Sequence, residues 1–370
     1  MKILYLFESG DWESRMAVAH SAKEKGFEIT IGLMNGDEET AKRAPEFNII
    51  PIKKSGDRFG ISAAIQMVRD INSLIKQEKP DIIHAVTLKY GFITGISSIF
   101  TKNTQKIYTL AGLGYIFRGD GKKSAILRTL LRPLLTFILR RPDTELIFQN
   151  IDDLNLMVKG KYARAEQSIL IRGSGIYLDR FTPTSPDTVP PIILMPTRLV
   201  HEKGVAIFVE AARILKSKGI EADFQIAGGE TKHNPKAISR EQMLEMTSDG
   251  VVKWLGRVND MPALLSQASL IVYPSYYGEG IPRVLLESCA AGRAIVTTDH
   301  PGCREAVENK VNGLLVPVKD ANATASAIEQ ILSDNNKRKS MEKQSRKRAE
   351  KQFNIHDIVK QTVALYRKQG

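Results

Sequence analysis

The stretch PSYYGEGIPRVLLE (residues 274–287) decides the fold, because it joins an apolar strand to a helix through a glycine-containing loop. The apolar run Leu270–Tyr273 precedes it, and Pro282 stands at the first turn of the predicted helix, a position that proline favours. A buried strand that leads through a loop into a helix is typical of a βαβ unit. Outward from this stretch, the same alternation repeats along both halves of the chain.

Short apolar runs alternate with amphipathic segments, which predicts parallel sheets covered by helices. The predicted strands are Ile3–Phe7, Glu28–Leu33, Ile49–Ile52, Asp81–Val86, Lys106–Leu110, Glu145–Phe148, Ser168–Ile171, Ile192–Pro196, Asp223–Ala227, Val251–Leu255, Leu270–Tyr273 and Ala294–Thr297. The predicted helices include Glu13–Lys25, Ile61–Gln77, Gly91–Phe100, Gly204–Lys216, Met261–Gln267 and Pro282–Ala291.

Segment 182–191 interrupts this alternation with Pro, Ser and Thr, a composition typical of an extended connector. We therefore predict two doubly wound α/β domains, residues 1–181 and 192–354, with 182–191 as the linker. A final helix at 355–370 is expected to pack back on the first domain. Ligands of such sheets bind outside the carboxyl ends of the strands, so a crevice between the domains is the expected site.

The charge of the chain favours an anionic partner. The 370 residues include 53 Lys and Arg against 41 Asp and Glu, a net charge of +12, which suits nucleic acid, an anionic membrane surface or a phosphorylated small molecule. Aromatic residues make up only 7%, and we find no nucleic-acid-binding motif, which argues against nucleic acid. No apolar run reaches the roughly 18 residues of a membrane-spanning helix. Cys289 and Cys303 are too few for a disulfide scaffold and are expected to be packed thiols.

The loop and helix start around Gly280 and Ile281 form the first candidate site. Free backbone N–H groups and the helix dipole favour an anion at such a helix start. Glu279 and Glu287 could hold sugar or ribose hydroxyls at the two ends of such a ligand. The alternative is that Glu279 is a solvated loop acid and Glu287 a helix-surface acid.

A second candidate site follows the strand Ile192–Pro196, in TRLVHEKG (residues 197–204). The guanidinium of Arg198 can bind phosphate in a bidentate manner, and Lys203 adds a compact positive charge. A cation at a helix start is unfavourable, so Lys203 should have an anionic partner. Two fixed cations can offset the charge of a diphosphate leaving group.

Together these clusters resemble the donor site of the retaining GT-B glycosyltransferases of family 4, a family with bacterial mannosyl-, glucosyl- and N-acetylhexosaminyltransferases. The resemblance extends over most of the chain, through FQNIDD (148–153), GSGIYLDRF (173–181), LGRVNDM (255–261), PGCREAVEN (301–309) and NGLL (312–315). It implies the GT-B fold, two Rossmann-like parallel-sheet domains facing a central crevice. It also implies sugar transfer with retention, without a metal ion or another cofactor.

The resemblance implies a role for each donor-site residue. Arg198 and Lys203 would neutralise the nucleotide diphosphate, and Glu279 would hold hydroxyls of the donor sugar. The remaining donor-binding residues would be Glu287 at the ribose, Gly280 and Ile281 at the phosphates, Gly256, Arg257 and Val258 beside the base, and Gly10 in the loop after the first strand. No protein nucleophile is implied, because the departing diphosphate is thought to deprotonate the acceptor.

His84 is the candidate for a catalytic histidine in the first domain. Many relatives carry a second histidine two residues further on, where this chain has Val86. A lone histidine at the end of an apolar strand can equally be a structural residue with its hydrogen bonds satisfied. The sequence leaves both interpretations open.

A basic amphipathic helix is predicted between Arg118 and Arg141, with a kink at Pro133. Apolar pairs recur every four residues from Ile126 to Leu139. The basic residues proposed to meet the acceptor or the membrane are Arg118, Lys122, Lys123, Arg128 and Arg132. The helix either lies on an anionic bilayer or packs into the first domain with a solvated basic face.

The chain also resembles the subgroup of family 4 that extends lipid-linked O-antigen, capsule or N-glycan precursors. That resemblance implies a UDP-N-acetylhexosamine donor, an undecaprenyl-diphosphate-linked saccharide acceptor, and a peripheral location on the cytoplasmic face of the cell membrane. A nicotinamide-dependent oxidoreductase is disfavoured, because ESGDWE (residues 8–13) lacks the G-x-G-x-x-G spacing. Two alternatives stay open: a UDP-sugar epimerase of the same architecture, and a transferase with a soluble acceptor.

Overall fold

The structure is a computed structural model that describes residues 1–52, 61–118, 121–184, 186, 188–231, 234 and 236–366, without the side chains of residues 61, 115 and 118. The chain divides into two compact units. The first contains residues 1–175, 278–280 and 355–370, and the second contains residues 176–277 and 281–354. The division therefore falls between Gly175 and Ile176, before the predicted linker at 182–191, and the final helix belongs to the first unit.

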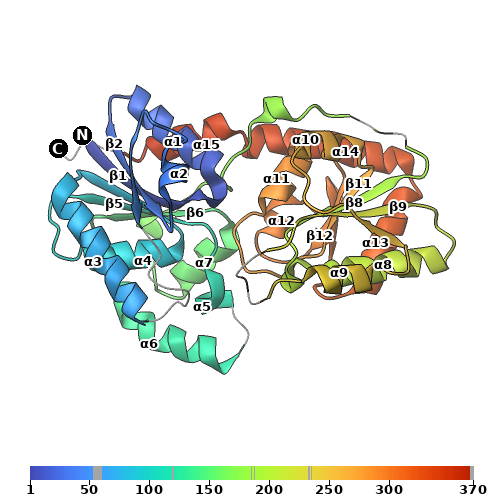
Figure 1. Ribbon diagram of the computed structural model, residues 1–370, viewed down its shortest axis with the longest axis horizontal. Helices are drawn as coiled ribbons and strands as arrows, with labels where there is room; N and C mark the ends of the chain where they lie inside the picture. Colours follow the sequence, from blue (N-terminus) through green and yellow to red (C-terminus); the bar gives the residue numbers. More distant parts are fainter. Residues whose placement is uncertain are drawn as a thin grey trace. The chain divides into compact units, whose positions relative to one another are not determined.

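The first unit is built on a seven-stranded parallel sheet with the strand order β3-β2-β1-β4-β5-β6-β7. Its strands are β1 (Lys2–Glu8), β2 (Glu28–Met34), β3 (Asn48–Ile52), β4 (Ile82–Val86), β5 (Gln105–Leu110), β6 (Thr144–Phe148) and β7 (Ser168–Leu170). Its helices are α1 (Trp12–Glu24), α2 (Glu38–Ala41), α3 (Ile61–Glu78), α4 (Leu88–Ser97), α5 (Gly114–Arg118), α6 (Lys122–Leu139), α7 (Ile151–Lys159) and α15 (Ile355–Val363). Helices α3, α4 and α6 cover one face of the sheet, and α1 and α15 cover the other (Figure 1).

The second unit repeats this plan with a six-stranded parallel sheet in the order β10-β9-β8-β11-β12-β13. Its strands are β8 (Ile192–Pro196), β9 (Asp223–Ala227), β10 (Val252–Trp254), β11 (Leu270–Tyr273), β12 (Ile295–Thr298) and β13 (Gly313–Val316). Its helices are α8 (Val205–Ser217), α9 (Arg240–Met246), α10 (Met261–Gln267), α11 (Arg283–Ala290), α12 (Cys303–Ala306), α13 (Ala321–Leu332) and α14 (Asn335–Gln352). The prediction missed β13, and it placed the other strands within two residues of their observed ends.

Both sheets reverse their strand order at the same topological position. The reversal lies between β1 and β4 in the first sheet and between β8 and β11 in the second. Because the strands on the two sides of such a reversal lead to opposite faces of the sheet, a crevice opens outside their carboxyl ends. These two switch points are therefore where ligand-binding residues are expected.

The last residues of the chain are fixed to the first unit by specific hydrogen bonds. Helix α15 packs on α1. The Gln105 side chain donates from Nε2 to the Leu365 carbonyl at 2.8 Å, at the amino-terminal end of β5. The buried ring of Tyr366 lies against Phe27, with 5.8 Å between ring centroids. The first unit is thus completed by residues that follow the whole second unit in the sequence.

The residues that enter the predicted linker are held by two arginines of the second unit, the buried Arg293 and the half-buried Arg346. The fully buried Arg293 donates to the carbonyls of Ala268, at 2.9 Å, and Thr184. Arg346 donates from Nη1 to the Phe181 carbonyl at 2.8 Å. The start of this segment is therefore part of the second unit rather than a freely extended connector. Cys289 and Cys303 are both buried, and neither forms a disulfide.

Candidate active site

Lys203 lies at the switch point of the second sheet, in the short 3₁₀ turn His201–Lys203 that precedes α8. Although it is a lysine, its side chain is almost fully buried. Its Nζ donates to the Tyr273 hydroxyl at 2.7 Å and lies 4.8 Å from the centre of the Tyr277 ring. Cation–π contacts and a hydroxyl acceptor stabilise an ammonium group at a helix start, where the helix dipole opposes it. Tyr273 and Tyr277 thus help to hold the Lys203 ammonium group, and the anionic partner expected from the sequence stays a prediction.

The loop that carries Lys203 is held tightly against the end of β11. Gly204 adopts a left-handed conformation with φ of 82°, and a Cβ at this position would lie 2.2 Å from the Pro274 carbonyl oxygen. Only glycine permits both the positive φ and this approach. The backbone of Tyr276 adds a hydrogen bond to the Glu202 carbonyl at 2.9 Å. Lys203 is therefore positioned by a rigid pair of loops.

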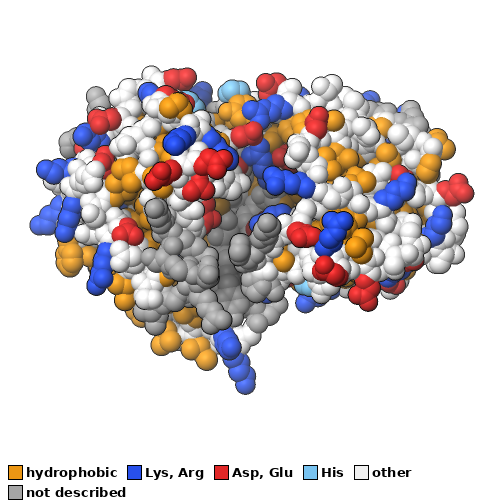
Figure 2. Space-filling view, viewed as in Figure 1, with side chains coloured by type: hydrophobic (Ala, Val, Ile, Leu, Met, Phe, Trp, Pro, Cys, Tyr) orange, Lys and Arg blue, Asp and Glu red, His pale blue; other side chains and the backbone are white. Residues whose placement is uncertain are grey.

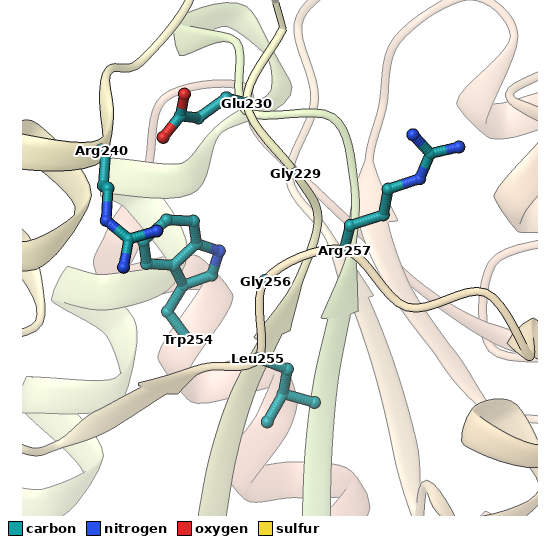
Figure 3. A pocket seen from close by; sticks show the side chains of 7 residues that line it. All are labelled: Gly229, Glu230, Arg240, Trp254, Leu255, Gly256 and Arg257. Atoms are coloured by element: carbon teal, nitrogen blue, oxygen red, sulfur yellow. The ribbon is translucent and has the colours of Figure 1, made fainter.

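A pocket of about 360 Å³ opens at the carboxyl ends of β9 and β10. Its lining residues are Gly229, Glu230, Arg240, Trp254, Leu255, Gly256 and Arg257. Figure 3 shows Arg240 beside the Trp254 ring, with Glu230 close to Arg240 and the Arg257 side chain extending away from them. The guanidinium carbon of Arg240 lies 5.6 Å from the centre of the Trp254 ring. An aromatic wall with polar groups beside it suits a planar heterocycle.

Close backbone packing fixes the floor of this pocket. The Trp254 indole donates from Nε1 to the Gly228 carbonyl at 2.8 Å, and the Gly228 N–H donates to the Gly256 carbonyl at 2.7 Å. A Cβ at Gly228 would lie 1.8 Å from the Thr197 carbonyl oxygen, so no other residue fits there. The loop after β8 therefore runs directly beside the pocket. Of the residues predicted to lie beside a base, Gly256 and Arg257 line the pocket, and Val258 is half-buried next to them.

The predicted acidic residues lie on the loop and helix expected for them. Glu287 is on α11, where its Oε1 accepts a hydrogen bond from Arg283 Nε at 3.0 Å, which orients the carboxylate. Glu279 is half-buried on the loop between β11 and α11, in the short segment grouped with the first unit. Gly280 and Ile281 are buried beside it.

Two further predicted donor residues are accessible in their own units. Arg198 is exposed on the loop that follows β8. Gly10 is exposed in the 3₁₀ turn Ser9–Asp11, and no atom lies within 4 Å of the position that a Cβ would take there. Both positions therefore leave space for a ligand.

His84 lies inside the first sheet rather than on a ligand-binding surface. Its side chain is 1% exposed, and both ring nitrogens are hydrogen-bonded: Nδ1 to the Tyr366 hydroxyl and Nε2 to the Thr109 hydroxyl, each at 2.7 Å. Burial, with a smaller contribution from the positive charge of Arg15, lowers the pKa of His84 to about 3. A ring without an accessible nitrogen cannot reach a substrate, so the structure favours the structural interpretation over the catalytic one.

The basic helix α6 shows features of both predicted environments. Leu135, Ile138 and Leu139 are fully buried in the first unit. The opposite stripe is exposed and consists of Ile126, Leu127, Leu130, Leu134 and Phe137. We call these five residues the α6 stripe. Figure 2 shows hydrophobic side chains at the lower edge of the molecule, where Figure 1 places α6, with basic side chains nearby.

The basic residues predicted to meet the acceptor or the membrane differ in their surroundings, and Arg118 ends α5 whereas the other four lie on α6. Lys122 and Lys123 are exposed, and Arg128 is half-buried. Arg132 donates to the Gly160 carbonyl at 2.8 Å and stacks on the Tyr162 ring, so it holds the helix to its own unit. The side chain of Arg118 lies outside the described residues. The helix continues through Pro133.

The sequence analysis did not single out Trp254, Arg240 or Glu230, although all three line the pocket. Trp254 directly precedes the Leu255-Gly256-Arg257 motif, so its position next to that motif was an available signal. Arg240 and Glu230 lie outside any recognised motif, and only the folded structure brings them to the pocket. In the described ranges, no group of three or more His, Cys, Asp or Glu side chains is arranged to hold a metal ion.

Two doubly wound parallel sheets, each with polar residues at the carboxyl ends of its strands, are the architecture of the GT-B class of α/β proteins. Residues 180–348 match the family described as glycosyl transferases group 1, and residues 2–150 match the glycosyl transferase 4-like family. The chain belongs to the GT-B glycosyltransferases of family 4.

Relatives of known activity match most of the chain. An N,N'-diacetylbacillosaminyl-diphospho-undecaprenol alpha-1,3-N-acetylgalactosaminyltransferase of Campylobacter jejuni is 26% identical over 382 residues, covering 99% of this chain and 98% of that protein. A UDP-Gal:alpha-D-GlcNAc-diphosphoundecaprenol alpha-1,3-galactosyltransferase of Escherichia coli is 26% identical, covering 82% and 80%. Among solved structures, a sucrose-phosphate synthase of Thermosynechococcus elongatus superimposes with a TM-score of 0.83 at 21% identity, covering 99% of this chain and 98% of that one. The predicted GT-B fold and glycosyltransferase family are thus confirmed.

Proposed function

We propose that this glycosyltransferase moves an N-acetylhexosamine from a UDP-sugar to an undecaprenyl-diphosphate-linked saccharide, with retention of configuration and without a metal ion. The reaction would take place at the cytoplasmic face of the membrane, with the protein bound peripherally. The observation that carries the proposal is the α6 stripe, an exposed apolar face on an enzyme whose relatives act on lipid-linked sugars.

The donor side of the proposal is supported by the second unit. The pocket beside Trp254 and Gly256 suits the flat ring of uracil, and the Escherichia coli relative uses UDP-Gal. Arg198 and Lys203 would bind the diphosphate, and backbone N–H groups of Gly280 and Ile281 would add to its stabilisation. Glu287, oriented by Arg283, would accept hydrogen bonds from the ribose hydroxyls.

The chemistry follows from where negative charge develops during transfer. As the bond between the sugar and the diphosphate breaks, charge accumulates on the departing oxygens, and fixed cations stabilise it. Lys203 suits this role because its ammonium group is held in place before the reaction by Tyr273 and Tyr277. Glu279 would hold the donor sugar, and the departing diphosphate would take the proton of the acceptor hydroxyl on the same face of the sugar.

The acceptor side is supported by α6. Leu130 is 72% exposed and Ile126 59%, a large apolar area for a helix that faces water. Lys122 and Lys123 lie one turn before the stripe and would meet anionic lipid headgroups. Within the described part of the chain, no helix is both long enough and apolar enough to span a bilayer.

A screen of donors and acceptors tests the proposal. UDP-GalNAc, UDP-GlcNAc and UDP-Gal would each be incubated with undecaprenyl-diphosphate-linked GlcNAc or N,N'-diacetylbacillosamine, and the products analysed by mass spectrometry and by NMR of the anomeric proton. We expect one N-acetylhexosamine to be added in α linkage, with equal rates in EDTA and in Mg²⁺. Transfer only to soluble sugars, or conversion of UDP-GlcNAc to an epimer without an acceptor, would contradict the proposal.

A further inference from the structure

A polar cluster that the sequence motifs do not include occupies the switch point of the first sheet. It consists of Glu8 at the end of β1, Asn35 directly after β2, and Lys89 and Tyr90 in the first turn of α4, which follows β4. We call these four residues the β1–β4 cluster. All four lie in the first unit, at the edge of the sheet where ligands of doubly wound folds bind.

The Glu8 carboxylate is the centre of this cluster. Its Oε1 accepts hydrogen bonds from the Tyr90 hydroxyl and from Asn35 Nδ2, the latter at 2.7 Å. Lys89 Nζ donates to the Tyr90 hydroxyl at 3.1 Å and lies 4.4 Å from the centre of its ring. Tyr90 is buried, and its burial is the main reason that the pKa of its hydroxyl is raised; the nearby charge of Glu8 raises it further. The hydroxyl therefore keeps its proton and remains a hydrogen-bond donor. The carboxylate is thus fixed in one orientation.

Two oxygen atoms of the cluster remain available to a ligand. Among the residues that the structure describes, Glu8 Oε2 and Asn35 Oδ1 receive no hydrogen bond, and both side chains are exposed. The amide orientation of Asn35 follows from its contact with the carboxylate, which can only accept, so Nδ2 faces Glu8 and Oδ1 faces away. The cluster therefore presents a pair of hydrogen-bond acceptors at the edge of the sheet.

The backbone around the cluster is held in unusual conformations. Thr87, which caps α4, has φ of 82°, and Asn35 has φ of 52°. A positive φ is costly for a β-branched residue and is typical of functional sites, where the surrounding structure maintains it. The Thr87 hydroxyl accepts from the Tyr90 N–H at 3.3 Å, which links this conformation to the position of Tyr90.

We infer that the β1–β4 cluster binds hydroxyl groups of the acceptor saccharide, with Glu8 as the residue that sets its affinity. Two fixed acceptor oxygens match the O–H donors of a sugar. A phosphate group has no proton to offer them at neutral pH, and the Glu8 charge repels it. The cluster therefore selects the sugar rather than the diphosphate of a lipid-linked acceptor. This inference rests on the proposed function, because it takes the acceptor to be a saccharide.

The variant Glu8→Gln tests this inference, with Glu28→Gln as the matched control. Glu28 is an exposed residue at the opposite, amino-terminal end of the neighbouring strand β2. We expect Glu8→Gln to raise the KM for the lipid-linked acceptor by about tenfold, the usual effect of losing a charged hydrogen bond, with kcat changed less than twofold. The KM for the UDP-sugar should stay unchanged, and Glu28→Gln should match the wild-type enzyme. A second variant, Asn35→Gly, permits the same positive φ and removes the side-chain amide. It should raise the KM for the lipid-linked acceptor by less than Glu8→Gln does.

A direct binding measurement separates this inference from the proposed function. Methyl N-acetyl-α-D-glucosaminide would be titrated into the wild-type protein and Glu8→Gln, with binding followed by saturation-transfer NMR. Signal in the wild type that is lost in Glu8→Gln supports the cluster as a sugar site, even if no tested lipid-linked acceptor is glycosylated. An unchanged acceptor KM in Glu8→Gln, or sugar binding that is the same in both proteins or absent from both, would overturn the inference.

Discussion

The switch points of the two sheets occupy the same position in the topology and hold opposite chemistry. Near the switch point of the second sheet, the loop after β8 carries the cations Arg198 and Lys203. Near the switch point of the first sheet, Glu8 ends β1 and Asn35 follows β2, and both present oxygen acceptors. The sheets themselves are built alike, so we expect the side chains at the carboxyl ends of their strands to determine the ligand. Cations suit a diphosphate, and oxygen acceptors suit a polyol.

Two buried titratable residues sharpen this contrast. His84 has both ring nitrogens hydrogen-bonded beneath the surface of the first sheet. Lys203 rests on aromatic rings at the end of the second sheet. Burial alone therefore does not identify a functional residue, and the direction in which its polar atoms point is the more useful observation.

The largest effect is expected from Lys203→Ala, because it removes a fixed cation at the proposed diphosphate site. We expect kcat/KM for transfer to fall by about 100-fold or more, with the folded state retained in circular dichroism. Lys216→Ala, a change to an exposed lysine on the same loop-and-helix segment, should leave transfer unchanged. Activity of Lys203→Ala within about threefold of the wild-type value would show that the donor site lies elsewhere.

The second prediction concerns the pH dependence of stability. The pKa of His84 is about 3 in the folded protein and has an ordinary value of 6.5, so between these values the unfolded chain binds a proton that the folded protein excludes. The stability contributed by the neutral ring is present above pH 6.5 and falls as the pH decreases, by at most about 1.4 kcal/mol per pH unit.

Urea unfolding of His84→Gln at several pH values between 7.5 and 5 measures this contribution. The variant should be less stable at pH 7.5, show a shallower decrease with falling pH than the wild type, and keep its transfer activity. If His84→Gln folds stably but loses transfer as Lys203→Ala does, His84 belongs to the catalytic machinery after all.

The third prediction tests the α6 stripe. The double variant Ile126→Glu, Leu130→Glu should bind anionic vesicles about tenfold more weakly or worse, because two exposed apolar side chains no longer enter the bilayer. Leu244→Glu changes an exposed leucine of α9 and serves as the control in a vesicle sedimentation assay. Arg132 is avoided, because its guanidinium holds α6 to Gly160 and Tyr162. Equal sedimentation of all three proteins would exclude the stripe as a membrane contact.

The smallest effect is expected at the pocket. Arg240→Ala removes the guanidinium group that lies against the Trp254 ring in the pocket. It should weaken UDP binding about threefold, the typical effect of losing an exposed cation–π contact. Arg164→Ala, a change to an exposed arginine of the first unit, provides the reference in isothermal titration calorimetry. A UDP affinity unaffected by Arg240→Ala would place the base away from this pocket.

The fold could largely be predicted, because buried parallel strands leave a strong apolar signal. The missed strand β13 shows the limit of that signal. It is short and begins at Gly313, a residue that weakens a strand prediction. In the structure a Cβ at Gly313 would lie 2.1 Å from the Ile295 carbonyl oxygen, so the glycine is what lets β12 and β13 approach.

The candidate site could be predicted where residues form local motifs, and not where tertiary contacts decide. Gly256 and Arg257 belong to one motif, and both line the pocket. Glu8 and Tyr90 are 82 residues apart, and their contact depends on the pairing of β1 with β4. For His84, the sequence could not reveal that its partner Tyr366 lies 282 residues further along the chain.

That last contact has a consequence for the order of synthesis. A ribosome makes β1 to β7 early, yet the hydrogen bonds of His84 to Tyr366 and of Gln105 to Leu365 can form only after the second unit has been synthesised. Until then the first unit lacks these two hydrogen bonds and the packing of α15 on α1. The first unit of this enzyme therefore reaches its final state only after the strands and helices of the second unit have been synthesised.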